Sequence, residues 1–123
     1  MAGEMVHIEV PADDTGAAMA FWGALFGLTF QAFPEGSEYH MAQINDRSGI
    51  AVSGMEPGKR GMRTYFDVAD IKASVAQVGS LGGASSDPMP VPGMGWFATC
   101  TDPSGNEFGL WQSDPQAPAM SAA

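Results

Sequence analysis

Alternation of apolar and polar side chains marks the first element that the sequence predicts. Val6, Ile8 and Val10 alternate with His7 and Glu9, and a period of two is typical of a strand with one buried face. The apolar residues are expected to pack under a helix. His7 and Glu9 then lie together on the opposite face of the strand.

A helix and three short strands are predicted to follow this strand. The helix has apolar residues at helical spacing, an aspartate able to cap its first turn and a glycine able to end it. These positions are Ala18, Phe21, Trp22 and Leu25 for the apolar face, Asp13 or Asp14 for the N-cap, and Gly27 for the end. Turn residues separate three strand candidates, at 28–33, 38–44 and 49–53.

The same order of elements occurs a second time. A strand at 63–68 precedes Asp70, a candidate N-cap, and an apolar helical face that stops at Gly82-Gly83. Because proline cannot donate to a strand ladder, residues 88–95 are either an edge segment that could act as a lid or a connecting loop. Further strand candidates lie at 87–91, 96–101 and 107–111.

This repeat predicts the α+β class, built from two βαβββ modules. The modules are expected at residues 3–56 and 62–113, joined by a linker at 57–61. Each is too small to bury its own sheet face, so the two are expected to associate as a single domain, 1–113. Residues 114–123 lack hydrophobic periodicity and are expected to form a flexible tail.

Charge and cysteine content restrict the partners and the compartment. The 123 residues include 5 basic and 14 acidic side chains, a net charge of −9. This balance disfavours nucleic acid and membrane surfaces and attracts cationic ligands, unless it serves solubility alone. The chain shows no signal-peptide pattern, no apolar stretch long enough to span a membrane, and a lone Cys100. A cytoplasmic location is therefore predicted.

Two motifs within this repeat resemble a known superfamily. One is Ala20-Phe21-Trp22-Gly23-Ala24-Leu25-Phe26-Gly27-Leu28, after Asp13-Asp14, and the other is Asp102-Pro103-Ser104-Gly105-Asn106-Glu107-Phe108-Gly109-Leu110-Trp111. Over residues 5–112 the chain resembles the vicinal oxygen chelate superfamily, which includes glyoxalases, bleomycin-resistance proteins and extradiol dioxygenases. The resemblance implies a cup-shaped mixed β sheet with flanking helices, and a dimer. This fold hosts several activities, so the resemblance does not select one.

The metal site of the superfamily's enzymes is expected to be absent. His7 stands at the ligand position of the first strand, but the resemblance places Arg63 and Gly109 at two other ligand positions, and residues 49–53 offer no carboxylate or imidazole. A guanidinium cannot ligate a metal and would repel a divalent ion. No metal and no cofactor are predicted, with His7 the one matching position.

Strand alternation predicts which side chains line the cup. Glu9, Asp67 and Glu107 could hold a cationic group, and the tryptophans could stack on an aromatic ligand. Alternatively, Trp96 and Trp111 fill the core or a dimer interface. The expected lining consists of His7, Glu9, Arg63, Tyr65, Asp67, Trp96, Glu107 and Trp111.

The sequence thus favours a small-molecule-binding protein over an enzyme. The predicted function is metal-independent sequestration of a drug-like or secondary-metabolite ligand, aromatic or cationic, by a homodimer. The alternative is a lyase, an isomerase or a dioxygenase-type enzyme of the same superfamily that uses His7 and Glu9, with or without a divalent metal. A further alternative is a structural or regulatory domain without a small ligand.

Overall fold

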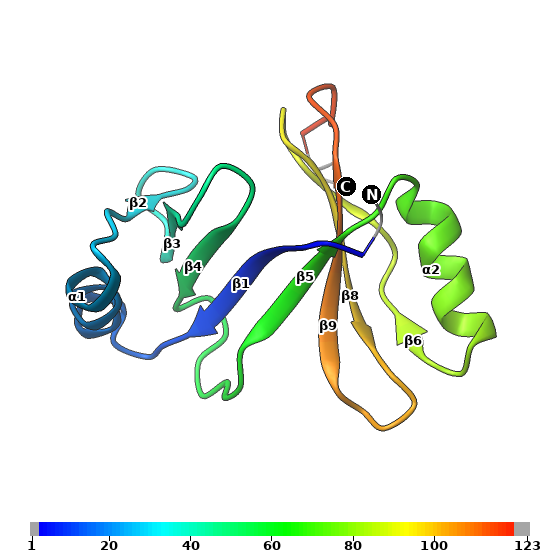
Figure 1. Cartoon of the computed structure of the whole chain (residues 1–123), viewed down its shortest axis with the longest axis horizontal. Helices are drawn as coiled ribbons and strands as arrows, with labels where there is room; N and C mark the ends of the chain where they lie inside the picture. The colour runs from blue at the N-terminus through cyan, green and yellow to red at the C-terminus, as the bar shows by residue number, and fades with distance from the viewer. Residues whose placement is uncertain (1–2, 120–123) are drawn as a thin grey trace. The chain divides into compact units, whose positions relative to one another are not determined.

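A computed structural model describes residues 3–119 of the chain. Its backbone divides into two compact units (Figure 1). The N-unit comprises residues 6–63, and the C-unit comprises residues 64–119 together with 3–5. Each unit contains one βαβββ order of elements, so the predicted α+β class with two such modules is confirmed. Neither helix among the described residues is long and apolar enough to cross a membrane.

The N-unit is a four-stranded sheet with one helix. The strand order is β2-β3-β4-β1, with β1 parallel to β4 and the other pairs antiparallel. The elements are β1 Met5–Pro11, α1 Thr15–Phe26, β2 Gln31–Ala32, β3 Tyr39–Gln43 and β4 Gly49–Ser53. The strand predicted at 28–33 is only two residues long in the structure, because only Gln31 and Ala32 pair with β3.

Local capping fixes both ends of α1. The side chain of Asp14 accepts a hydrogen bond from the backbone N of Ala17 at 3.0 Å, so Asp14 rather than Asp13 is the N-cap. Gly27 ends the helix with a left-handed φ of 67°, a conformation that glycine adopts without strain. The carboxylate of Asp13 instead accepts from the backbone N of Gly58 at 3.0 Å.

Burial separates the two faces of the N-unit sheet as alternation predicted. Val10, Ala42 and Ile50 form a buried cluster, against which Ile8 and Trp22 pack. His7 and Glu9 alternate with these residues along β1, so their side chains lie on the other face of the sheet, away from α1. The N-unit therefore presents one apolar face to its helix and one polar face.

The C-unit repeats this plan with an additional strand. Its order is β5-β9-β8-β6, with β5 parallel to β9, and β7 also pairs with β8. The elements are β5 Arg63–Asp67, α2 Ile71–Ser80, β6 Ala84–Ser85, β7 Met89–Val91, β8 Gly95–Thr101 and β9 Glu107–Ser113. Asp70 caps α2, as predicted, by accepting from the backbone N of Ala73 at 3.2 Å. The helix ends at Ser80 with Leu81 as its C-cap, just before the predicted Gly82-Gly83.

Two short strands take the place of the one predicted at 87–91. Ser85 pairs with Cys100, and Pro90 pairs with Trp96, so β6 and β7 lie along β8 in succession. The intervening Ser86 receives the backbone N–H of Thr99 on its side-chain oxygen, at 3.0 Å. The proline-containing segment is thus an edge strand, which is where proline is tolerated.

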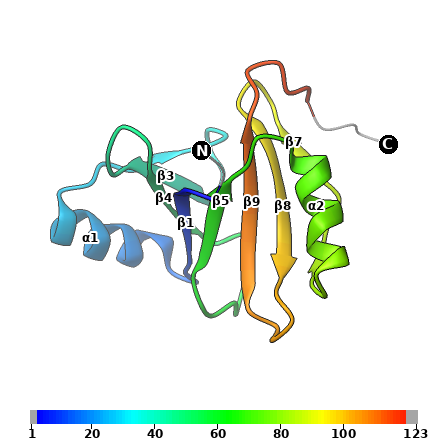
Figure 2. The same ribbon diagram turned by 45° about the vertical axis from the view of Figure 1, so that its right-hand side comes forward.

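Helix α2 covers one face of β8 and β9 (Figure 2). Ile71, Ala98, Cys100 and Leu110 are buried there, and Trp96 packs against them. Cys100 is a free, buried thiol. Burial raises the pKa of this thiol, and its contact with the hydroxyl of Ser85 only partly offsets that effect.

A tight turn joins β8 to β9. The side chain of Asp102 accepts hydrogen bonds from the backbone N atoms of Ser104 and Asn106 and from the Asn106 amide, all at 2.9 Å. These bonds hold the pKa of the Asp102 carboxyl below its ordinary value. Gly105 in this turn has a φ of 86°, a left-handed conformation that glycine adopts without strain.

Residues beyond β9 fold back on the turn between β7 and β8. Asp114 donates its backbone N–H to the carbonyl of Met94 at 2.9 Å, and Ala117 accepts from the backbone N of Gly93 at 2.9 Å. The side chain of Asp114 also accepts from the indole N of Trp96 at 3.0 Å. Residues 120–123 of the predicted tail lie outside the described residues.

Candidate functional site

The polar face of the N-unit sheet carries a connected set of side chains, which we call the polar network: His7, Tyr39, Glu9 and Arg63. Nε2 of His7 lies 2.9 Å from the Tyr39 hydroxyl, and that hydroxyl donates to Oε2 of Glu9 at 2.8 Å. Arg63 donates from a terminal nitrogen to Oε1 of Glu9, also at 2.8 Å. One carboxylate thus holds a phenol on one oxygen and a guanidinium on the other.

Strand register brings the members of this network together. His7 and Glu9 share a face of β1, and β4 lies between β1 and β3. Tyr39 pairs with Ser53, and Ser53 pairs with Pro11, so the tyrosine begins β3 close to the end of β1. Its long side chain reaches across β4 to the two β1 side chains.

The hydrogen-bond order defines the protonation state of His7. The Tyr39 hydroxyl has one proton, which it donates to Glu9, so its oxygen accepts from His7. The Nε2 of His7 therefore carries the proton, and Nδ1 is the basic nitrogen. Burial lowers the pKa of His7 from 6.5 to about 4, because an imidazolium loses hydration there. His7 is neutral at pH 7.

A second, weaker set of ion pairs borders the network. Arg63 lies 3.6 Å from Glu56, and Lys59 lies 3.9 Å from the other oxygen of Glu56. The Arg63 side chain is 11% exposed and that of Glu9 is 15% exposed, whereas Glu56 is 50% exposed. Glu9 and Arg63 therefore form the desolvated pair, and Glu56 is a solvated outer partner.

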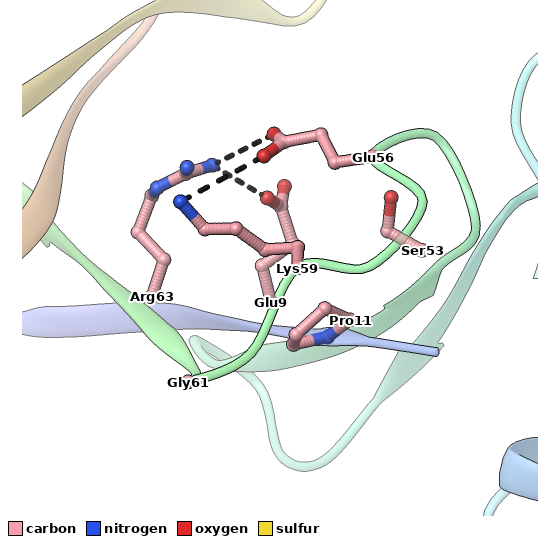
Figure 3. A pocket seen from close by; sticks show the side chains of 7 residues that line it. All are labelled: Glu9, Pro11, Ser53, Glu56, Lys59, Gly61 and Arg63. Atoms are coloured by element: carbon pink, nitrogen blue, oxygen red, sulfur yellow. Dashed lines mark hydrogen bonds and ion pairs between the residues drawn. The ribbon is translucent and has the colours of Figure 1, made fainter. Parts of the chain in front are cut away.

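A pocket lies beside these charges (Figure 3). Glu56, Lys59 and Arg63 point toward one another on one side of it, and Pro11 and Ser53 lie on another. Its cavity volume is only about 10 Å³, and the rest of the space beside these side chains is open to solvent. The lining residues are Glu9, Pro11, Ser53, Glu56, Lys59, Gly61 and Arg63.

The described residues do not fit the metal of the superfamily's enzymes. Within residues 3–119, no three His, Cys, Asp or Glu side chains gather as a metal would require. The guanidinium of Arg63 is committed to Glu9. The registers also revise the expected correspondence: His7 pairs with Gly49 as Tyr65 pairs with Gly109, so Tyr65, and not Arg63, is the C-unit counterpart of His7.

Four predicted lining residues share one face of the C-unit sheet. Tyr65 pairs with Gly109 and Asp67 with Trp111, which sets their side chains on the same side. Glu107 alternates with Gly109 and Trp111 on β9, so it belongs to the same face. Tyr65 is buried, and its ring occupies the space that a side chain at Gly109 would need. The Tyr65 ring therefore fills the space next to Gly109.

Trp96 lies on the other face of the C-unit sheet. It pairs with Gln112 and packs with the residues under α2, whereas Phe97 pairs with Trp111. The expectation that Trp96 and Trp111 line one surface is not met. For Trp96, the alternative that it contributes to packing describes its position better.

The other histidine of the chain, His40, lies in a different part of the N-unit. It pairs with Val52 on the helix side of the N-unit sheet, and its side chain is mostly covered. Its Nε2 lies 3.9 Å from Glu38, whose other close partner is the hydroxyl of Thr15 at 2.7 Å. His40 takes no part in the polar network.

Among the polar side chains of this site, sequence reasoning missed Tyr39, Ser53, Glu56 and Lys59. Ser53 and Tyr39 were assigned only to strands, and the other two lie next to or in the predicted linker. The one signal available was the alternation of β3, which puts Tyr39 and Met41 on the same face.

The family of the chain follows from its sequence as well as from this fold. A family model for the glyoxalase-like domain matches residues 5–111. The chain therefore belongs to the glyoxalase-like domain family.

The curated relatives are mycobacterial. The chain is 31% identical over 122 residues to a protein named "Putative glyoxylase CFP32", found in Mycobacterium tuberculosis and in Mycobacterium bovis. The match covers 93% of this chain and 46% of the relative. The chain thus spans about half the length of the curated relatives it matches.

Solved structures share the fold at low sequence identity. Methylmalonyl-CoA epimerase from Mycobacterium tuberculosis is similar with a TM-score of 0.69 and 14% identity, over 91% of this chain and 89% of the epimerase. A superfamily member from Vibrio splendidus is similar with a TM-score of 0.64 and 16% identity, over 93% and 100%. These likenesses confirm the fold class and leave the activity open.

Proposed function

We propose that this chain is a metal-independent small-molecule-binding protein that sequesters a drug-like or secondary-metabolite ligand. The observation that carries the proposal is the polar network, in which both oxygens of Glu9 already have partners at 2.8 Å. Side chains that hold one another in place form a preorganised surface, and preorganisation favours binding. A general acid or base would need a pKa near the working pH, whereas the pKa of His7 is about 4.

The aromatic part of such a ligand has a candidate platform in the C-unit. Trp111 and Phe97 are paired neighbours on the face of the sheet away from α2. Aromatic side chains next to a few polar groups are typical of sites for planar ligands. Three carboxylates were expected to attract a cationic ligand. The charge of one of them, Glu9, is neutralised by Arg63, so the expected preference for a cation is weaker.

The test combines a thermal-shift screen of aromatic natural products with metal analysis of the same purified sample. A subset of compounds is expected to raise Tm, because a ligand at 100 times its Kd stabilises the folded state by about 2.7 kcal/mol. Trp111→Leu should reduce the shift, and Trp22→Leu, on α1, is the matched control. One tightly held divalent ion per chain, or no stabilising compound, would contradict the proposal.

A second candidate function is that of an isomerase or lyase, favoured by the basic Nδ1 of a neutral His7. It predicts that the chain exchanges an acidic C–H of a bound compound with deuterium from the solvent, and that His7→Ala abolishes the exchange. In a binding protein, the same variant keeps most of the ligand-induced rise in Tm. NMR of the ligand in heavy water separates the two candidates.

We also propose that the protein forms a homodimer. Phe21, Leu25 and Phe26 of α1 are each more than half exposed, and such apolar patches mark interfaces. A second copy is the occupant we propose, because the curated relatives are about twice as long and have room for a second segment of this size. Sedimentation equilibrium should give twice the chain mass, and Leu25→Glu should give the monomer. A monomeric unmodified protein would contradict this.

A cytoplasmic, reducing compartment remains our proposal for its location. Cys100 is a buried free thiol, and burial raises its pKa, which keeps it in the unreactive thiol form. Fractionation of cells that produce the protein would test this, and recovery from an extracellular fraction would contradict it.

A further inference from the structure

We propose that the pocket of the N-unit binds an oxyanion, such as the carboxylate or phosphate group of a ligand, between Arg63 and Lys59. In the described structure, the side-chain carboxylate of Glu56 occupies the position that we assign to the ligand oxyanion. The inference rests on the proposed function, since it names the charged group by which the small molecule is held.

The first step is that the two cations converge on one carboxylate. Arg63 lies 3.6 Å from Oε1 of Glu56, and Lys59 lies 3.9 Å from Oε2 (Figure 3). An oxyanion that carries two oxygens is thus already accommodated between a guanidinium and an ammonium. Carboxylates and phosphates both match this pair of donors.

The second step is that Glu56 is held loosely. Both of its ion pairs are longer than a hydrogen bond, and its side chain is 50% exposed. An exposed ion pair of this kind contributes little to stability. A ligand oxyanion at hydrogen-bond distance would therefore displace Glu56 at small cost.

The third step is that the pocket itself is well fixed. Glu9 holds Arg63 at 2.8 Å and is itself held by Tyr39. The loop that carries Lys59 is anchored by two bonds: Gly58 donates its backbone N–H to Asp13 at 3.0 Å, and Lys59 donates its own to the carbonyl of Glu56 at 3.1 Å. Displacing the Glu56 side chain therefore leaves the rest of the pocket in place.

Because Glu56 competes with the ligand, removing its charge should strengthen anion binding rather than weaken it. In a chain with a net charge of −9, anions are disfavoured at long range. Removing this carboxylate by Glu56→Gln should tighten anion binding roughly three- to tenfold, equivalent to about 1 kcal/mol. Lys59→Gln should weaken binding by a similar factor.

The measurement is an amide NMR titration of the full chain with sodium acetate and with sodium phosphate, against sodium chloride at equal ionic strength. Saturable shifts are expected at the amides of Lys59 and Gly61, and the tighter anion identifies the ligand as a carboxylate or a phosphate. Glu35→Gln and Lys72→Gln are the matched controls, because they make the same charge changes away from the pocket. They should leave the apparent Kd unchanged.

Three results would overturn the inference. Chloride could produce the same shifts, Glu56→Gln could bind no more tightly than Glu35→Gln, or neither oxyanion could shift the pocket amides. If aromatic compounds still raised Tm in that last case, this inference would fail while the proposed function stood. If the oxyanions bound but no aromatic compound raised Tm, the proposed function would fail while this inference stood.

Discussion

The two units place different side chains at one equivalent position of the same module. In the N-unit, His7 on the first strand pairs with Gly49 on the parallel neighbour, and in the C-unit Tyr65 pairs with Gly109. A Cβ at Gly49 would lie 3.5 Å from His7 and 3.2 Å from the carbonyl of Ala42, whereas a Cβ at Gly109 would overlap the Tyr65 ring. The imidazole is tied into hydrogen bonds, and the phenol ring is used for packing.

The next residue on each face continues the difference. Glu9 is ion-paired with Arg63 and bonded to Tyr39. Its counterpart Asp67 pairs across the strand with Trp111, and no described residue donates a side-chain hydrogen bond to its carboxylate. A repeated backbone thus supports a polar network in one unit and an aromatic surface in the other, and three experiments can test that division.

The largest expected effect comes from Glu9→Gln. The substitution leaves the guanidinium of a largely buried Arg63 without a full counter-charge, which should lower the free energy of unfolding by about 3 kcal/mol. Asp67→Asn, the matched change in the C-unit, should cost less than about 1 kcal/mol. Urea unfolding of both variants gives the values. Equal losses of unfolding free energy would contradict the proposed difference between Glu9 and Asp67.

The pH dependence of stability should come next in size. The pKa of folded His7 is about 4, below the 6.5 of the unfolded chain, so the unfolded state binds the proton more readily between these values. Stability should therefore fall as pH drops from 6.5 to 4, by about 3 kcal/mol at most.

Thermal unfolding across this pH range measures the effect. His7→Gln should flatten the curve, and His40→Gln should leave most of the slope in place. A slope that survives His7→Gln would assign the dependence to other groups.

The smallest of the three effects is the loss of stability when the glycine on the parallel neighbour strand is replaced by alanine in each unit. Gly109→Ala places a methyl group against the buried Tyr65 ring and should cost about 2 kcal/mol. Gly49→Ala places one 3.2 Å from the carbonyl of Ala42 and 3.5 Å from His7, and should cost about 1 kcal/mol or less. Differential unfolding measures both. A reversed order would contradict the packing assigned to Tyr65.

Features encoded by neighbouring residues could be predicted from the sequence. Asp14 and Asp70 cap helices because a short acceptor precedes each apolar helical pattern, and the faces of β1 follow from simple alternation. The two-residue strand β6 gave no such signal. Ala84 and Ser85 are in a strand only because β8 lies beside them.

The candidate site could be predicted only in part, because it depends on register between distant strands. His7, Glu9 and Arg63 were expected together, and the N-unit does bring them together. Tyr39 joins them only through the pairing of β3 with β4 and of β4 with β1. Trp96 was misplaced for the same reason, since the side of β8 that faces α2 is set by its pairing with β9.

The turn held by Asp102 has a consequence for the order in which the chain folds. It joins strands that are adjacent in sequence, whereas the pairing of His7 with Gly49 must wait for a long loop through α1, β2 and β3 to close. Local pairings form faster than such long closures. We therefore expect the β8–β9 hairpin to be the nucleus of the C-unit, so that Asp102→Ala slows refolding more than it accelerates unfolding in stopped-flow measurements. The reverse pattern would place the nucleus elsewhere.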